Sequence, residues 1–163
     1  MMQAMAQSDA DAMAHHDFFV AFAAAVLCWQ HVEQSLFGTF YKMLDKVDIE
    51  AAGAIFYAQN SFGAKLKVVD KVAQTVLDEL DLVSWRKIKE ELDHRSRDRN
   101  ALVHLTAVAD FQADGTMGLA MAPSMFVPKA LRQTRPKIDA TECDRLADVF
   151  RDLGLRLSAF RAP

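Results

Sequence analysis

The chain has 163 residues, of which 52% are hydrophobic, and it contains eleven Phe and two Trp. That length and composition suit one ordinary domain with a single hydrophobic core. Six glycines and four prolines are few, and three of the prolines fall at positions 123, 128 and 136, so the rest of the chain is free to form long helices. We predict an all-α protein with one domain over residues 9–161 and a flexible N-terminal tail over residues 1–8.

The net charge of the chain excludes a general attraction to polyanions, because it is −3 at pH 7. Binding of nucleic acid would need a local basic patch. One candidate patch lies near Pro136 and consists of Lys129, Arg132, Arg135 and Lys137. This cluster can follow a phosphate backbone, although a solvated linker is the more ordinary interpretation.

The two cysteines, Cys28 and Cys143, lie inside helical patterns and lack a metal-ligand spacing. They suit buried thiols in a reducing compartment, and a disulfide is allowed but not implied. The apolar run from Phe18 to Trp29 is similar to the core of a signal peptide, but His15-His16-Asp17 precedes it where Lys or Arg is typical. The run is also too short to span a bilayer. We expect a cytoplasmic protein that does not associate with a membrane.

Apolar residues at steps of three and four predict the helices of the first half of the chain. The first long helix begins with a cap at Ser8 or Asp9, ends near Lys46, and has the apolar face Phe18, Phe22, Val26, Trp29, Val32, Leu36, Phe40 and Met43. A short helix follows over about 48–57. A cap at Asn60-Ser61 opens the second long helix, over 62–80, with the apolar face Phe62, Leu66, Val69, Ala73, Val76 and Leu80.

The second half of the chain predicts two more long helices and a hairpin between them. The third long helix runs from near Ser84 to about His104, and the fourth begins near Thr141, with the apolar face Leu146, Phe150, Leu153, Leu157 and Phe160. Between them, Asp114-Gly115 and its apolar neighbours indicate a turn joining two short extended segments. The predicted architecture is an up-and-down bundle of four long helices plus a short helix, with a small β-hairpin after the third long helix.

Two stripes of residues run along the third long helix at 100° per residue. The core-facing stripe consists of Trp85, Ile88, Leu92, Arg99, Leu102 and Val103. The second stripe is entirely polar and consists of Arg86, Glu90, Asp93, Arg97, Asn100 and His104. Its ordinary interpretation is a solvated surface with ion pairs at i, i+4, each worth about 0.3–0.5 kcal/mol.

Arg99 is unusual because a guanidinium in an apolar row needs a carboxylate, phosphate or carbonyl partner if it is buried. Glu33 is one candidate partner, since it lies beside the apolar stripe of the first helix. The alternative for Glu33 is that its carboxylate reaches the rim of the core.

The string Arg99-Asn100-Ala101-Leu102-Val103-His104 has the form Arg-polar-x-x-x-His that characterises HEPN domains. HEPN domains carry this motif near the end of their third long helix, as here. Two further strings add to the likeness: Trp29-x-x-Val32-Glu33-x-x-Leu36 on the first helix and Ser61-Phe62-x-x-Lys65-Leu66 opening the second. Over residues 26–121 the chain therefore resembles uncharacterised bacterial HEPN proteins, although Leu105 follows the histidine where related sequences often have a glycine.

The resemblance implies a helical bundle, usually a homodimer, in which Arg and His of both subunits meet in a cleft. Many members are metal-independent endoribonucleases, several of them toxins paired with an antitoxin or defence proteins, and others have no demonstrated activity. By this resemblance, His104 would be the general acid or base acting at the RNA 2′-hydroxyl or the leaving 5′-oxygen. Arg99 would stabilise charge on the phosphorane and Asn100 would orient the histidine or the phosphate.

The remaining site expectations concern binding. Arg97, Glu33 and Lys65 are candidate substrate-binding residues, and neither a metal nor another cofactor is implied. His15-His16 predicts an exposed pair rather than a metal site, because spacing supplies no third ligand.

Arg99 and His104 lie five positions apart and therefore point about 140° away from each other on a straight helix. They can meet if the helix distorts near Asn100, if the long arginine wraps around, or if a dimer partner supplies one of them. Asn100 and His104, at i and i+4, share a face. The alternative function is a non-catalytic HEPN-like module that binds a nucleotide, nucleic acid or protein, and the negative net charge favours it.

Overall fold

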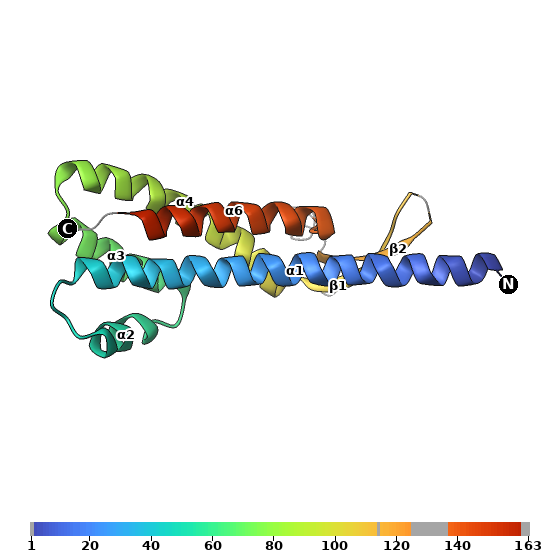
Figure 1. Cartoon of the computed structure of the whole chain (residues 1–163), viewed down its shortest axis with the longest axis horizontal. Helices are drawn as coiled ribbons and strands as arrows, with labels where there is room; N and C mark the ends of the chain where they lie inside the picture. The colour runs from blue at the N-terminus through green and yellow to red at the C-terminus, as the bar shows by residue number, and fades with distance from the viewer. Residues whose placement is uncertain (1, 114, 125–136, 161–163) are drawn as a thin grey trace. The chain divides into compact units, whose positions relative to one another are not determined.

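The computed structural model describes residues 2–113, 115–124 and 137–160 (Figure 1). Within these ranges it contains five helices and one antiparallel hairpin, in the order α1 (Met2–Met43), α2 (Ile49–Tyr57), α3 (Phe62–Val76), α4 (Glu79–His104), β1 (Thr106–Phe111), β2 (Met117–Ala122) and α6 (Ala140–Ala159). The prediction of a mainly helical protein with a small hairpin after the third long helix is confirmed.

The chain divides into two compact units, and the boundaries between them cut α1, α4 and α6. The hairpin unit comprises Met1–Leu27 and Asn100–Asp148. The helical unit comprises Cys28–Arg99 and Val149–Pro163. The single domain over 9–161 stays a prediction.

The hairpin unit is organised by the pairing of β1 with β2, from Thr106 opposite Ala122 to Phe111 opposite Met117. Gly115 adopts φ +87°, a left-handed conformation that glycine takes without a steric penalty, and its amide N–H donates to the carbonyl of Gln112 at 3.1 Å. The predicted turn is thus confirmed at Gly115, whereas Asp114 lies outside the described residues.

A buried carboxylate lies on β1 of the hairpin unit. Asp110 is only 6% exposed, accepts a hydrogen bond of 2.8 Å from the Gln112 side-chain amide, and forms an ion pair with Lys137. Lys137 therefore neutralises a carboxylate of its own chain. The other members of the predicted basic cluster, Lys129, Arg132 and Arg135, lie outside the described residues.

In the helical unit, aromatic side chains of α2, α3 and α6 pack against α1. Trp29 contacts Phe62 and Phe150, with ring centroids 4.7 and 5.1 Å apart. The predicted apolar face of α1 is buried in this unit at Trp29, Val32, Leu36, Phe40 and Met43. Each fully buried side chain of this size contributes about 1.5–3 kcal/mol to folding.

The ends of α1 differ from those predicted. The helix begins at Met2, so the predicted cap at Ser8 or Asp9 is wrong, whereas the flexible tail over 1–8 stays a prediction; this segment is rich in Ala and Met, which are strong helix formers, and has no Gly or Pro. The helix ends at Met43 instead of Lys46 because Asp45 and Lys46 have positive φ values of 29° and 55°, which a right-handed helix cannot accommodate.

The boundary between α3 and α4 also differs from the prediction. Leu77 is extended and ends α3 at Val76, so Leu80, expected on its buried face, is 81% exposed. The Asp78 carboxylate accepts a hydrogen bond of 2.9 Å from the Asp81 amide, which caps α4 five residues before Ser84. Asp139 likewise accepts from the Glu142 amide at 2.9 Å, so α6 is capped there and not at Thr141.

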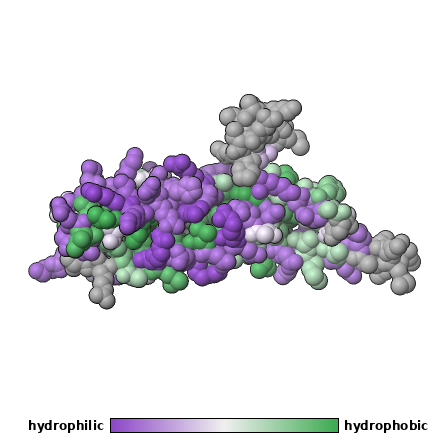
Figure 2. All heavy atoms as spheres, turned by 90° about the horizontal axis from the view of Figure 1, so that it is seen from above, coloured by the Kyte–Doolittle hydropathy of each residue, from purple (hydrophilic) through white to green (hydrophobic). Residues whose placement is uncertain are grey.

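The part of the chain that the structure describes has one helix long and apolar enough to cross a membrane, at Gln7–Met43. This statement rests on the length and composition of the helix, and the core helix of a soluble protein or a signal sequence can have the same length and composition. Several large apolar side chains of this helix are exposed, including Met13, Phe19 and Leu27. Figure 2 shows such apolar surface as separate patches between hydrophilic ones.

A buried carboxylate joins α3 to α4 in the helical unit. Asp70 is 8% exposed and accepts hydrogen bonds from Trp85 Nε1 at 3.0 Å, Lys89 Nζ at 2.7 Å and Gln74 Nε2 at 2.9 Å. Burial alone would raise the pKa of Asp70, but the bonds from Lys89 and Trp85 and the charge of Lys89 outweigh it, so the pKa lies below its ordinary value. Residue spacing along α3 and α4 did not predict this network.

We predict that Asp70→Asn lowers the free energy of unfolding at pH 7 by about 1–3 kcal/mol, because Trp85 and Lys89 lose their charged acceptor. The folded-state pKa is lowered, so the contribution of the carboxylate is present above the unfolded value near 3.8 and is lost as the pH falls below it. Urea unfolding at pH 7 and pH 3 measures both effects. Asp144→Asn, at an exposed position on α6, is the control, and an equal loss in both variants would contradict the prediction.

Both cysteines are free, and Cys143 is buried in the hairpin unit whereas Cys28 is half-buried. Burial, followed by the charges of Asp139, Asp144 and Glu142, raises the pKa of the Cys143 thiol to about 12. The prediction of two buried thiols is therefore confirmed only for Cys143.

We predict that Cys143 resists alkylation at pH 8, since almost none of its thiol is ionised there and the side chain is buried. Iodoacetamide labelling of a Cys28→Ser variant, followed by mass spectrometry, isolates this residue. Labelling is expected to be at least ten-fold faster in urea than in native buffer. Equal rates in the two conditions would overturn the prediction.

Candidate functional site

The polar stripe of α4 faces solvent along its whole length, as predicted. All six of its residues are exposed: Arg86, Glu90, Asp93, Arg97, Asn100 and His104. Arg97 Nη2 lies 3.3 Å from Asp93 Oδ2, and both side chains are mostly exposed. This is the i, i+4 surface pair expected from the sequence, and such pairs contribute little to stability.

The opposite side of α4 is only partly apolar. Trp85, Leu92 and Leu102 are buried there, but Val103 is 40% exposed although the periodicity placed it with them. Arg99 is half-buried, and both Arg99 and Asn100 interact with other residues of the chain. The prediction that Arg99 leaves the solvated side of the helix is therefore confirmed in part.

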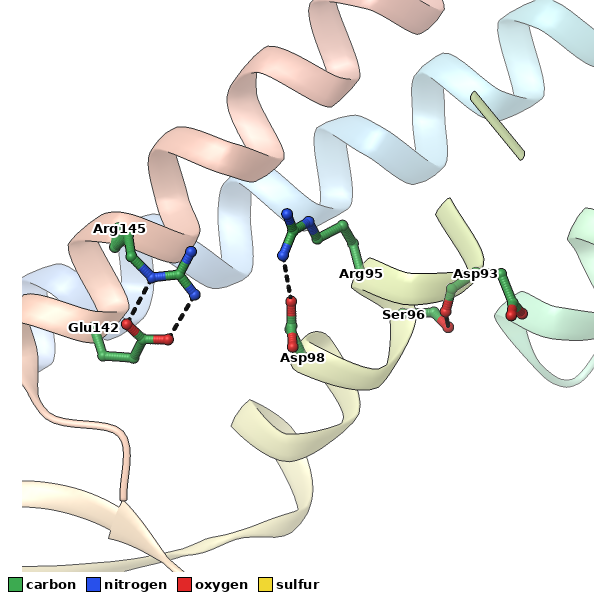
Figure 3. A network of polar contacts seen from close by, with 6 residues as sticks. All are labelled: Asp93, Arg95, Ser96, Asp98, Glu142 and Arg145. Carbon is green, nitrogen blue, oxygen red and sulfur yellow. Dashed lines mark hydrogen bonds and ion pairs between the residues drawn. The ribbon is translucent and has the colours of Figure 1, made fainter. Parts of the chain in front are cut away.

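Arg95 is a second arginine on the less exposed side of α4, and sequence reasoning missed it. It lies three residues after Leu92 and seven before Leu102, which is the spacing that would have revealed it. Its Nη1 donates to Asp98 Oδ2 at 3.1 Å, as Figure 3 shows. Its Nε is buried without a hydrogen-bond partner among the described residues. The pair Glu142–Arg145, also drawn there, belongs to the first turns of α6.

His104 is the last residue of α4 and is exposed, and the buried Leu105 follows it directly before β1. Asn100 and His104 are one turn apart on the exposed stripe, so both side chains can reach a ligand on that side of the helix. The boundary between the two units falls between Arg99 and Asn100. The convergence of Arg99 with His104 stays a prediction.

Glu33 and Lys65, two predicted substrate-binding residues from different helices, form an ion pair inside the helical unit. Their side chains are 25% and 13% exposed. The Lys65 ammonium also lies over the rings of Phe56 and Tyr57, at 5.3 and 5.1 Å from their centroids. Opposite charge and cation–π contacts together hold the lysine in place. The carboxylate of Glu33 is thus satisfied at the rim of the core.

The described residues contain no group of three or more His, Cys, Asp and Glu side chains that could hold a metal ion. His16 is exposed, as expected. His15 is not, because it is half-buried and its Nε2 is buried with no hydrogen-bond partner among the described residues. The prediction of an exposed pair is therefore wrong for His15.

Comparison of the chain with protein-family models, with curated proteins and with solved structures finds no match.

We predict that Lys65→Met lowers the free energy of unfolding by about 1–3 kcal/mol, because it leaves the Glu33 carboxylate partly buried and unpaired. The double variant Lys65→Met/Glu33→Gln is expected to recover much of this loss, since it removes both charges. Urea unfolding at pH 7 measures the effect.

Arg97→Met is the matched control for this cycle, because it breaks an exposed pair and should change stability by less than about 0.5 kcal/mol. Additive losses from Lys65→Met and Glu33→Gln would contradict an energetically coupled pair.

Proposed function

We propose that this chain is a HEPN-like endoribonuclease that cleaves RNA without a metal ion. One observation carries the proposal: the last turns of α4 expose Asn100 and His104 on one face, in the Arg-polar-x-x-x-His order that begins at the half-buried Arg99. An exposed imidazole is suited to general acid–base catalysis. A guanidinium held partly out of water is suited to binding a phosphate.

In the proposed reaction His104 acts as the general base and takes the proton from a ribose 2′-hydroxyl. The 2′-oxygen then attacks the adjacent phosphorus, and the bond from phosphorus to the 5′-oxygen breaks. The leaving 5′-oxygen takes a proton from a water molecule, and the imidazolium of His104 returns its proton to solvent, so the products are a 2′,3′-cyclic phosphate and a 5′-hydroxyl. Arg99 would stabilise the charge on the phosphorane, and Asn100 would orient the histidine or the phosphate. Arg97 would contact the substrate backbone from the exposed stripe.

The same proposal includes the assembly. The long helices α1, α3, α4 and α6 would form an up-and-down bundle, and two copies would pair so that Arg99 of one and His104 of the other share a cleft. In that arrangement Arg99 and His104 could meet although side chains five positions apart on one helix point in different directions. We place the protein in the cytoplasm, away from membranes, as a toxin or defence component with RNA as substrate and an antitoxin protein as a further partner.

A non-catalytic HEPN-like module, binding a nucleotide, nucleic acid or protein, is the second candidate. The ion pair between Glu33 and Lys65 favours it, because two residues expected to bind substrate instead neutralise each other. The net charge of −3 also favours it, since RNA gains no general attraction to such a surface.

We predict that the purified protein cleaves labelled single-stranded RNA in the presence of EDTA and that His104→Ala lowers the rate by about 10²–10⁴-fold, the range typical of a general acid or base. Arg99→Ala is expected to lower it as well. Gel analysis of the products, with detection of cyclic phosphate ends, is the measurement. His94→Ala removes another exposed histidine of α4 and is the control that should keep full activity.

Intact RNA over a range of substrates and protein concentrations would reject the catalytic proposal in favour of the binding module. Light-scattering mass tests the shared cleft separately. A strict monomer that still cleaves RNA would support the proposed reaction but contradict a site shared between two subunits.

A further inference from the structure

An open surface pocket of about 270 Å³ lies between α1 and α6 in the helical unit. We call it the Gly38 pocket. It is lined by Gly38 and by six polar side chains: His31, Gln34, Ser35, Thr39, Lys42 and Ser158. None of the lining residues is acidic. The pocket belongs to one unit and shares no residue with the stripe on α4.

One glycine inside a long helix lines this pocket and a second contacts the lining residue His31, although glycine weakens a helix interior relative to alanine. A Cβ added at Gly38 would meet no atom within 4 Å, so packing does not require glycine there. Because Gly38 has no side chain, the space of the pocket beside it stays open. A Cβ at Gly154 would lie 2.6 Å from Cδ2 of His31, so this second glycine makes room for the imidazole at the pocket wall.

The hydrogen bonds within the pocket leave donors unused. Lys42 Nζ donates one of its three hydrogens to the carbonyl of Ser158 at 3.3 Å. The hydroxyls of Ser35 and Ser158 lie 3.0 Å apart and share one hydrogen bond, which leaves the hydrogen of one hydroxyl for a ligand. Thr39 is different, because its hydroxyl already donates to backbone carbonyls of Ser35 and Leu157.

Lys42 is the only lysine or arginine among the residues lining the pocket. The carboxyl-terminal turns of α1 and α6 each bring a partial negative charge of roughly half an elementary charge. The carbonyls of Leu157 and Ser158, where part of that charge lies, already accept hydrogen bonds from Thr39 and Lys42. A ligand that contacts Nζ directly is nearer to the positive charge than to these carbonyls, so an anion is preferred over a cation.

We propose that the Gly38 pocket binds a small molecule through an oxyanion group, either a phosphate or a carboxylate. A lysine ammonium is a suitable point charge for such a group, and hydroxyl, amide and imidazole donors complete its coordination. The volume is close to the lower end of ligand pockets, about 300–1,000 Å³, so the ligand is small. The proposal is independent of RNA cleavage and adds a second site to the molecule.

The test is a titration of the ¹⁵N-labelled full chain by NMR at constant ionic strength, with inorganic phosphate in one arm and malonate in the other. Chloride is the control for screening. Saturable shifts at the amides of Gln34, Gly38 and Ser158 are expected, with a dissociation constant on the order of 1 mM. The arm with the tighter constant identifies which oxyanion the site prefers.

Two pairs of variants test the location. Gly38→Met fills the pocket and should abolish binding, while Gly63→Met, at a helical glycine with equally open space, should leave it unchanged. Lys42→Met should weaken binding at least five-fold, while Lys67→Met removes an exposed lysine of α3 and should not. Thermal unfolding of all four variants checks that they fold.

Binding that survives in both Gly38→Met and Lys42→Met, or shifts that chloride reproduces, would overturn the proposal. Linear shifts without saturation in both arms would overturn it as well. None of these outcomes bears on RNA cleavage, which is measured without phosphate or malonate.

Discussion

The buried carboxylate of Asp70 is the constraint on which the presentation of α4 depends. It accepts donors from Trp85 and Lys89 on α4 and from Gln74 on its own helix, α3. An indole N–H and an ammonium at the edge of an apolar core would each be costly without an acceptor. With Trp85 anchored, the rotation of α4 is set, and the stripe ending at His104 faces solvent as a consequence of helical geometry.

Polar partners recur at several buried or half-buried polar groups of the two units. Glu33 meets Lys65, Asp110 meets Lys137, and the hydroxyl of Thr39 bonds two carbonyls. Each of these contacts joins segments that are distant in the sequence or lies at a helix end. They add specificity to packing that is otherwise supplied by Phe and Trp side chains, because a hydrogen bond is satisfied in one register only.

The two candidate sites place different chemistry on the same scaffold. The α4 stripe offers an exposed imidazole and amide beside a half-buried arginine, which is suited to a large substrate that approaches from solvent. The Gly38 pocket offers a single ammonium among hydroxyls, which is suited to a small anion. They share no residue, so a substitution in one removes no side chain of the other.

Periodicity in the sequence determined the helices, most of their apolar faces and the polar stripe of α4, because 3.6 residues per turn decide which residues share a face. Gly115 determined the turn of the hairpin, since few other residues adopt its φ. Helix ends were predicted less well: the carboxylates of Asp78 and Asp139 act as caps, and positive φ values at Asp45 and Lys46 end α1. Only the tertiary structure decided that Lys65 pairs with Glu33, that Asp70 holds Trp85, and that Gly38 opens a pocket. The physical reason is that these contacts join faces of different helices, and spacing within one helix carries no information about which faces meet.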